Sequence, residues 1–517
     1  MDDFPARLRA IADLQASEMR EGAGRHEYDG RISDLSPDAV RSGLARLGLG
    51  EPFPDPHDEA HATAAEEALR VELGELELHR SNPLWHIGEL DLSVYDKDYA
   101  PAGERDEARL RHLAAWPDAV DNAVAALDRV SAPVAGALLS SVRGLAAAVP
   151  ADAPGDVREA ALAAHRRFTA HIEAAARDGA PSAALGGAAL ARLMGTAEAA
   201  AVDLGRLAEL ADAERDRLTE RMAEAAARID PSRAPLDLAR ELVRDHPDAD
   251  GVLTEARRWT EHSIAFTRER DLVPYHDGEC AVGVAPESAR WGTAMMSWAA
   301  PAEADAPAHY YVTPPEPDWE PAEAAEWLEV FSATTLPAIS VHEVAPGHFS
   351  HSRALRRAPG AVRRTLFSYA FIEGWAHYAE ELCVDEGFGG YAERAVGDPR
   401  FTAAHFEVGV WLEALIRVTR LAAAIGVHTG AMSVEDAAAR FAADTVLAGP
   451  AALSEARRAS FDPTYGRYTW GKLEILGLRD RAKERWGAGY TTRRFHAAML
   501  DLGAPPLGLL GTAVDRG

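Results

Sequence analysis

Apolar residues recur every three to four positions along most of this alanine-rich chain, and this spacing is typical of amphipathic helices. The segment 187–229 lacks a sustained heptad of large apolar residues, so we expect it to pack within a helical body rather than to form a coiled coil. Clusters of Pro, Gly and Asp, such as VPADAPGD and DPSRAPLD, separate the segments. The pattern predicts long helices over 119–147, 155–178, 187–229 and 235–270.

The pattern changes between residues 272 and 316, where prolines and glycines separate short runs that contain Val, Trp, Met and Tyr. Such runs indicate a few short strands, whereas helical spacing returns with EPAEAAEWLEVFSATTL. A small sheet in a helical protein suggests a special role, and lining a groove beside a reaction centre is one. We therefore expect three parts in one continuous structural unit: an N-terminal helical part over 1–271, a small sheet in 272–316 and a helical part over 317–517.

The charge balance narrows the possible partners. The chain carries 54 Lys and Arg against 82 Asp and Glu, for a formal net charge of −28 at pH 7. Nucleic acids and anionic membranes attract basic surfaces, so we expect neither as a partner. The apolar fraction of 47% is ordinary for a folded protein.

Cysteine usage and the N-terminus indicate a compartment. Cys280 and Cys383 lie far apart and form no metal-ligand pattern, which favours reduced thiols. The N-terminus MDDFPARLRAIADLQ lacks the basic and then apolar order of a signal peptide. The most apolar stretch, APVAGALLSSVRGLAAAVP, is interrupted by Arg143 and is a poor membrane span. These features predict a soluble cytoplasmic protein.

The stretch SVHEVAPGHFSH, residues 340–351, begins like the helix of a zinc hydrolase, with Glu343 directly after His342. Zinc hydrolysis needs three protein ligands, an open position for water and a carboxylate beside that water. The HExxH pattern places its second histidine one helical turn after the first. Here the next histidine, His348, comes six residues after the first, and on a regular helix its side chain would point about 120° away.

Pro346 and Gly347 offer a way to bring the two imidazoles together. Proline cannot continue helical hydrogen bonds and glycine adopts unusual conformations, so the helix can be distorted here. A kink would return His348 to the face of His342 and leave Glu343 beside the metal. Chance also produces His-Glu pairs, as in RHEYDG, so the spacing allows a metal site without requiring one.

The segment LFSYAFIEGWAHYAEELCVDEG, residues 366–387, supplies the candidate third ligand. As a helix it aligns Glu373, His377 and Glu380 in a polar line with apolar side chains on either side. A buried carboxylate there needs a metal ion or a cationic neighbour, unless the line is exposed or pairs with arginine. Gly374 in mid-helix favours the close approach of a neighbouring element or a substrate. Together with the His-Glu pair, the segment favours a metal site.

These motifs carry a family resemblance. HEVAPGH and FIEGWAHYAEEL resemble the stretches H-E-x-x-P-G-H-H and E-G-W-A-x-Y-x-E of the bacterial family called domain of unknown function 885. YTWGKLEILGLRDRAK, residues 468–483, is similar to that family's closing segment, and the resemblance is strongest over 335–485. It implies a mainly α fold: a large helical body with a deep active-site groove and a small antiparallel sheet, related to gluzincin carboxypeptidases and oligopeptidases.

The resemblance also implies roles for individual residues in the 317–517 part, which would be the catalytic part. His342, His348 and Glu373 would bind one Zn²⁺ ion, and Glu343 would be the general base. The family usually has a second histidine after the first motif, and Phe349 stands in that place here.

If that second histidine were the true ligand, His351 or His377 would be drawn toward the metal instead of His348. We prefer His348.

Hydrolysis by activated water also needs a hydrogen-bond donor for the developing oxyanion. Tyr468, in the closing segment, is the first candidate and Tyr465 the second, although either could be a packed core residue. Glu380 and His377 are candidates for orienting a ligand imidazole. The strand-like segment 291–313 could pair with an extended peptide.

The leading hypothesis is therefore a zinc-dependent metallohydrolase, a peptidase that acts on short peptides. One alternative is an amidase that acts on a non-peptide small molecule. Another is a non-catalytic helical protein that binds metal or has lost it. The intact Glu343 disfavours this last reading, because a structural metal site needs no base.

Overall fold

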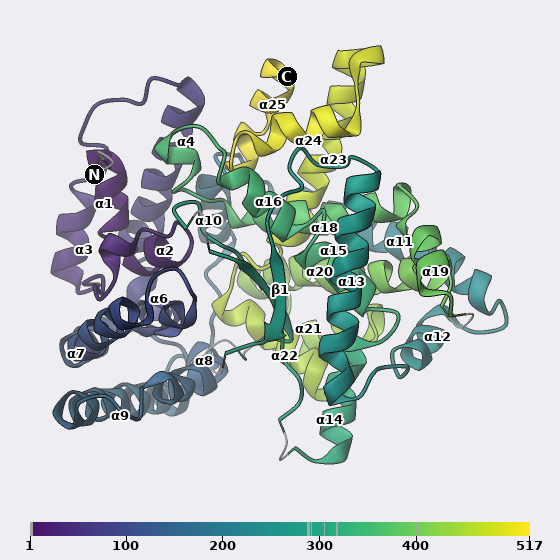
Figure 1. Ribbon diagram of the computed structural model, residues 1–517. Helices are drawn as coiled ribbons and strands as arrows, with labels where there is room; N and C mark the ends of the chain where they lie inside the picture. Colours follow the sequence, from purple (N-terminus) through teal and green to yellow (C-terminus); the bar gives the residue numbers. More distant parts are fainter. Residues whose placement is uncertain (1–3, 287–289, 291, 304–305, 317–318, 399–400) are drawn as a thin grey trace.

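The computed structural model describes residues 4–286, 290, 292–303, 306–316, 319–398 and 401–517. Within them the chain is mainly helical with one small sheet, as predicted. Helices α1 to α9 form one side of the molecule (Figure 1) and span Ala6–Ala12, Ala16–Glu21, Pro37–Leu44, Pro56–Leu69, Leu78–Ser81, Leu84–Leu90, Ala102–Ala126, Ala132–Gly144 and Gly155–Asp178.

The remaining helices surround the sheet and the candidate site (Figure 1). Before the sheet come α10 to α13, at Gly187–Ala197, Leu204–Ile229, Pro235–Leu242 and Ala249–Glu269. After it come α14 to α19, at Pro321–Leu328, Leu336–Glu343, His348–Leu355, Gly360–Arg363, Tyr369–Asp385 and Phe388–Val396. The last are α20 to α25, at Ala403–Thr429, Val434–Asp444, Gly449–Phe461, Arg467–Trp486, Thr492–Leu500 and Gly511–Arg516.

The predicted helix over 155–178 coincides with α9, but the other long helices are shorter than predicted. Three predicted segments each divide into two helices: 119–147, 187–229 and 235–270. The second divides where Ala199 adopts a left-handed conformation with φ of 48°. The third divides because the Asp248 side chain accepts a hydrogen bond from the Gly251 amide and starts α13 afresh. Apolar spacing continues across such short breaks and does not reveal them.

The sheet has three strands, β1 (Cys280–Val284), β2 (Ala294–Ser297) and β3 (Ala308–Val312), in the order β1-β3-β2. It is mixed rather than antiparallel, which corrects the sequence expectation: β2 pairs antiparallel with β3, but β1 pairs parallel with it. The reason is that the chain passes from β1 to the far edge before β3 fills the centre. In the predicted segment 291–313, β2 is therefore an edge strand and β3 is not, while Trp291 lies outside the described residues.

The sheet lies against α15, which carries His342, and against α13. β1 contacts α13, and β2 contacts α15. Along β3 the side chains of Ala308, Tyr310 and Val312 are buried, whereas His309 and Tyr311 on the other face stack on each other with ring centroids 5.2 Å apart. One face of the sheet thus belongs to the main core.

The main core joins residues from α10 to the C-terminal helix, from Leu190 to Val514. Two further apolar clusters lie in the N-terminal third: one spans Leu90–Ile172, and the other joins α1 to α4 with Val362 and Leu366. Helices α10 to α13 therefore share their core with the C-terminal part of the chain. Among the described residues, no helix is both long and apolar enough to cross a membrane.

Candidate metal centre

The chain leaves the helix between the two candidate histidines, as the sequence predicted. α15 ends at Glu343 and α16 begins at His348. Between them Val344 has φ of −104° and ψ of −93°, and the Ala345–Pro346 peptide bond is cis. Gly347 passes so close to the preceding helix that a β-carbon on it would lie 1.8 Å from the carbonyl oxygen of His342. Only glycine fits this position.

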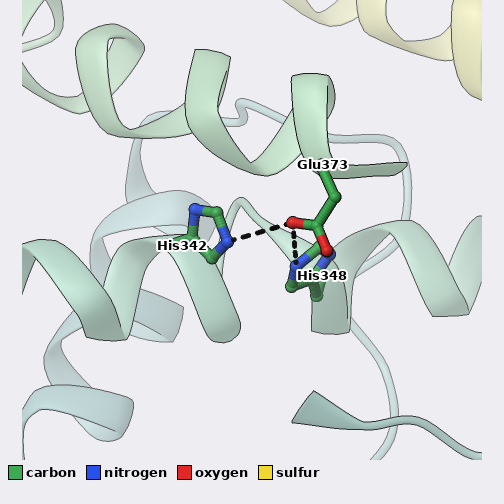
Figure 2. Close-up of side chains that lie close together, drawn as sticks. All are labelled: His342, His348 and Glu373. Atoms are coloured by element: carbon green, nitrogen blue, oxygen red, sulfur yellow. Dashed lines mark ion pairs between the residues drawn. The ribbon is translucent and has the colours of Figure 1, made fainter. Parts of the chain in front are cut away.

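The break brings the candidate ligands together, as Figure 2 shows. The Nε2 atoms of His342 and His348 lie 3.6 Å and 3.5 Å from the same oxygen, Oε2 of Glu373. The two imidazole rings are nearly perpendicular, with centroids 4.8 Å apart. One ligand atom from each residue lies within 4.8 Å of the others, and this is the one such group of three in the described residues.

These distances fit a zinc ion. Ligand atoms about 2.0–2.2 Å from a tetrahedral zinc lie about 3.3–3.6 Å from one another. The donor set, two imidazole nitrogens and one carboxylate oxygen, is a common one for catalytic zinc and leaves a fourth position open. Both histidines are buried, and the Glu373 side chain is 20% exposed, so the centre is reachable from solvent on the Glu373 side.

The ionisation of the centre reflects its crowding. Burial lowers the pKa of His342, and so does Arg417, but the carboxylates of Glu373 and Glu380 outweigh both and raise it to about 9. Burial raises the pKa of Glu373, but hydrogen bonds with His342 and His348 outweigh it and hold the pKa well below its usual value. A negative carboxylate thus sits between two imidazoles, which favours a positive charge at the centre.

Glu380 contacts the nitrogen of His342 that does not face Glu373. Its Oε1 atom lies 2.5 Å from Nδ1 of His342, which leaves Nε2 to face Glu373. Its other oxygen accepts from Arg417 at 3.2 Å and lies 3.2 Å from Nδ1 of His377. Burial raises the pKa of Glu380, but Arg417, His377 and His342 outweigh it and lower it. Glu380 therefore contacts the candidate ligand His342 directly, whereas His377 contacts Glu380. The sequence analysis proposed both residues as candidates for orienting a ligand imidazole.

Glu343 faces the sheet. Its side chain is buried and forms no hydrogen bond or ion pair within the described part of the chain. Its charge contributes to raising the pKa of two strand residues, Tyr310 and Cys280, although burial is the larger cause for each. The pKa of Cys280 reaches about 12. The carboxylate proposed from sequence as a base is thus unengaged among the described residues and lies close enough to the sheet for its charge to act on Tyr310 and Cys280.

Two glycines let the helix that carries Tyr468 cross closely over α18. α18 and α23 cross where a β-carbon on Gly374 would lie 2.5 Å from Gly471, and one on Gly471 would lie 1.9 Å from the Ala370 carbonyl oxygen. This confirms the close approach expected at Gly374. Tyr468 lies one turn before Gly471, and its pKa is raised first by burial and then by the charge of Glu373.

Three other named residues lie elsewhere. Tyr465 is fully buried, and its hydroxyl donates to the Glu455 carbonyl oxygen at 3.3 Å, so it is a core residue. His351 is also fully buried, with Nε2 3.1 Å from the Gly503 carbonyl oxygen. Phe349 is buried under the guanidinium of Arg353. Neither His351 nor His377 belongs to the group of three.

The sequence reading missed Arg417 and Arg353. Arg417 is a buried charge in α20, within the long apolar run VGVWLEALIRVTRLAAAIGV. A buried arginine in such a run requires an anion as its partner, and the sequence shows this signal at Arg417 and Arg420. Arg353 had no comparable signal, because it stands among other arginines in HSRALRRAPG.

Comparisons with known proteins agree with this architecture. The sequence profile of a family described as "Bacterial protein of unknown function (DUF885)" matches residues 18–514. A "putative lipoprotein" from Colwellia psychrerythraea has a similar structure, with a TM-score of 0.79, 15% identity, and coverage of 99% of this chain and 98% of that one. A "putative lipoprotein of unknown function" from Shewanella oneidensis gives a TM-score of 0.75, 17% identity, and coverage of 98% and 97%. At these identities the likeness concerns the fold. No curated protein matches the chain.

Proposed function

We propose that this chain, which belongs to the DUF885 family of bacterial proteins of unknown function, is a zinc-dependent hydrolase that cleaves short peptides. The observation that carries the proposal is the convergence of His342, His348 and Glu373 on one point, with the unengaged Glu343 next to the first histidine. A purely structural metal site would need no such carboxylate.

The residues present fit a zinc ion. The two nitrogen-to-oxygen separations of 3.5 Å and 3.6 Å are those of tetrahedral ligands. The buried Nδ1 atom of His348 has no protein partner, whereas Nδ1 of His342 is held by Glu380. When bound, Zn²⁺ acidifies a water molecule and polarises a carbonyl group.

The chain's own side chains then divide the work of hydrolysis. Glu343 takes the proton of the attacking water and returns it to the leaving amine. Tyr468 donates a hydrogen bond to the oxyanion that develops on the substrate carbonyl. Glu380 fixes which nitrogen of His342 faces Glu373, because its own oxygen occupies the other one. Arg417 keeps Glu380 charged and in place.

A groove leading to the centre is part of the proposal. Tyr369 begins α18 one turn before Glu373, and it is 44% exposed. We place it on one wall of this groove. The Tyr369 hydroxyl lies 2.8 Å from both carboxylate oxygens of Glu18 on α2, which would form the opposite wall. Kinship with gluzincin peptidases is likewise proposed, on the strength of the donor set and the adjacent glutamate.

The test combines metal analysis with one conservative substitution. We expect one zinc per chain in protein purified without chelator, and hydrolysis of a peptide library. Glu343→Gln is expected to keep the zinc and to lower kcat about 10²- to 10⁴-fold, because it removes the base alone. The matched control is Glu326→Gln, an exposed glutamate on α14, with unchanged kcat.

Two results would refute the proposal: protein that contains no stoichiometric zinc, or full activity in Glu343→Gln. Turnover of small amides with no turnover of peptides would redirect it to an amidase.

A further inference from the structure

Arg353 is a buried cation without an ion-pair partner among the described residues, and it lies on the same helix as a candidate ligand. It lies on α16 five residues after His348 and is 3% exposed. Its Nε and Nη2 atoms are fully buried and donate no hydrogen bond, and the side chain forms no ion pair within the described residues. Burying a charge without a partner is costly, so such a group calls for an explanation.

The neighbouring charges do not neutralise Arg353. Asp277, the nearby acid that acts on it, forms its ion pair with Arg357 instead, at 2.7 Å. Arg356 donates to the carbonyl oxygens of Glu303 and Ala306. Burial is the main cause that lowers the pKa of Arg353 to about 10, and Arg356 adds to the lowering. Arg353 thus lies beside two further arginines, of which Arg357 is paired with Asp277.

The surroundings of Arg353 lead back to the candidate centre. Its guanidinium lies 4.7 Å from the ring centroid of Phe349, the residue that follows His348. The charges of Glu343 and Arg353 both act on the thiol of Cys280 on β1: Glu343 raises its pKa and Arg353 lowers it. Arg353 and Glu343 therefore both lie near β1.

The backbone of Gly278 packs directly against the guanidinium. A β-carbon on Gly278 would lie 2.4 Å from Nη1 of Arg353, so only glycine allows this close approach. Gly278 has φ of +92°, a conformation in which glycine is favoured. A planar guanidinium whose Nε and Nη2 donors form no hydrogen bond is suited to a carboxylate, which it can bind through two parallel hydrogen bonds.

We propose that Arg353 is a specificity-determining residue that binds the C-terminal carboxylate of a peptide substrate. This inference rests on the proposed function, and it deepens it: the substrates are peptides with a free C-terminus, cleaved near that end. The carboxylate supplies the missing partner of Arg353 while Glu343 acts on the bond that is cleaved.

Binding, rather than turnover, tests the inference directly. The full chain carrying Glu343→Gln is titrated with N-acetyl-alanyl-phenylalanine and with its C-terminal amide, and heat of binding is measured. We expect the free acid to bind about 10- to 100-fold more tightly than the amide, the range of a charge-assisted hydrogen-bonded pair. Equal affinity for acid and amide would overturn the proposal.

Two substitutions of Arg353 and one control locate the effect. Arg353→Gln is expected to abolish the preference for the acid, and Arg353→Lys to restore part of it, because lysine keeps the charge but not the paired donors. Arg357→Gln removes a neighbouring, more exposed charge and is expected to keep the preference. An acid preference that survives in Arg353→Gln would refute the assignment. If Arg353→Gln does not fold, Arg353→Lys decides instead. A reduced preference for the acid in folded Arg353→Lys would support the assignment, and a full preference would refute it.

Turnover separates this inference from the proposed function. In the wild-type chain, peptides with a free C-terminus should have a kcat/KM about 10- to 100-fold above their amides, and Arg353→Gln should raise KM for the free acids more than it lowers kcat. Hydrolysis without any preference would leave the proposed function standing and remove this inference. Acid-selective binding in a chain that never hydrolyses peptides would remove the proposed function and leave Arg353 as the residue that binds the carboxylate.

Discussion

Two of the three helices that hold the candidate centre differ in how they accommodate buried charge. On α18, Glu380 contacts three partners, and Glu381 lies within ion-pair distance of Lys472 and Arg217. On α16, Arg353 has no ion-pair partner among the described residues, and its Nε and Nη2 atoms donate no hydrogen bond. Glu380 is 1% exposed and Arg353 is 3% exposed, so burial does not explain the difference.

The contrast separates two uses of a buried charge. On the α18 side, Glu380 and its partners fix the orientation of His342, and a second group of ion pairs joins Glu381 through Lys472 to Glu214 on α11. On the α16 side, the unpaired charge of Arg353 lowers the stability of the folded chain, but it is available to a ligand. We therefore interpret the paired charges on α18 as positioning the ligand His342, and the unpaired Arg353 on α16 as available to bind a substrate.

The largest effect should come from breaking the paired side at Lys472. This side chain is fully buried and lies 2.6 Å from Glu214 and 3.1 Å from Glu381. Lys472→Met should lower the free energy of unfolding by about 3 kcal/mol, because two buried carboxylates lose a shared cation while Arg217 remains. Urea denaturation measures the change. Lys483→Met, which removes an exposed lysine, should change the free energy by less than about 0.5 kcal/mol, and equal effects would contradict the role of pairing.

Removal of the metal should have the next largest effect. Zinc at 100 times its dissociation constant would stabilise the folded chain by about 2.7 kcal/mol, so a chelator should lower the unfolding temperature measurably. His348→Ala should show the lower temperature from the start and no further response to chelator. A wild-type chain indifferent to both zinc and chelator would argue against a bound ion.

A smaller effect should follow from neutralising Glu380 alone. Glu380→Gln keeps the shape but weakens the hold on His342, so zinc affinity should fall about 10- to 100-fold. Competition with a chromogenic chelator measures it. Glu381→Gln changes the adjacent residue, which contacts Lys472 and Arg217 but not His342, and should leave zinc affinity unchanged. Matching losses in the two variants would mean that the network acts only through general stability.

The smallest effect, of opposite sign, is expected at Arg353. Arg353→Met replaces an unpaired buried cation by a shorter, unbranched apolar side chain and should raise the free energy of unfolding by about 1 kcal/mol. The cation–π contact with Phe349 is lost, which keeps the gain small. Urea denaturation measures the change. A lower free energy of unfolding in Arg353→Met would mean that Arg353 stabilises the fold as the paired charges do, and would contradict the difference proposed between α16 and α18.

Local chemistry explains what the sequence could predict of this molecule. The break at Pro346-Gly347 follows from the backbone properties of two residues, and the close approach at Gly374 follows from a glycine inside a helix. The strand order and the partners of Arg353 and Lys472 depend on residues far away in the chain. Lys472 stands in the polar run GKLEILGLRDRAK, where it resembles an exposed side chain until Glu214 and Glu381 are placed beside it.

The crossing of Gly374 and Gly471 limits how such an enzyme could adapt to different substrates. The two helix backbones are in direct van der Waals contact there, so the tyrosine of one and the ligand glutamate of the other form a single rigid wall. That wall cannot widen for a bulkier peptide. Any accommodation would have to come from the side of the sheet, where no glycine among the described residues makes a comparable backbone contact.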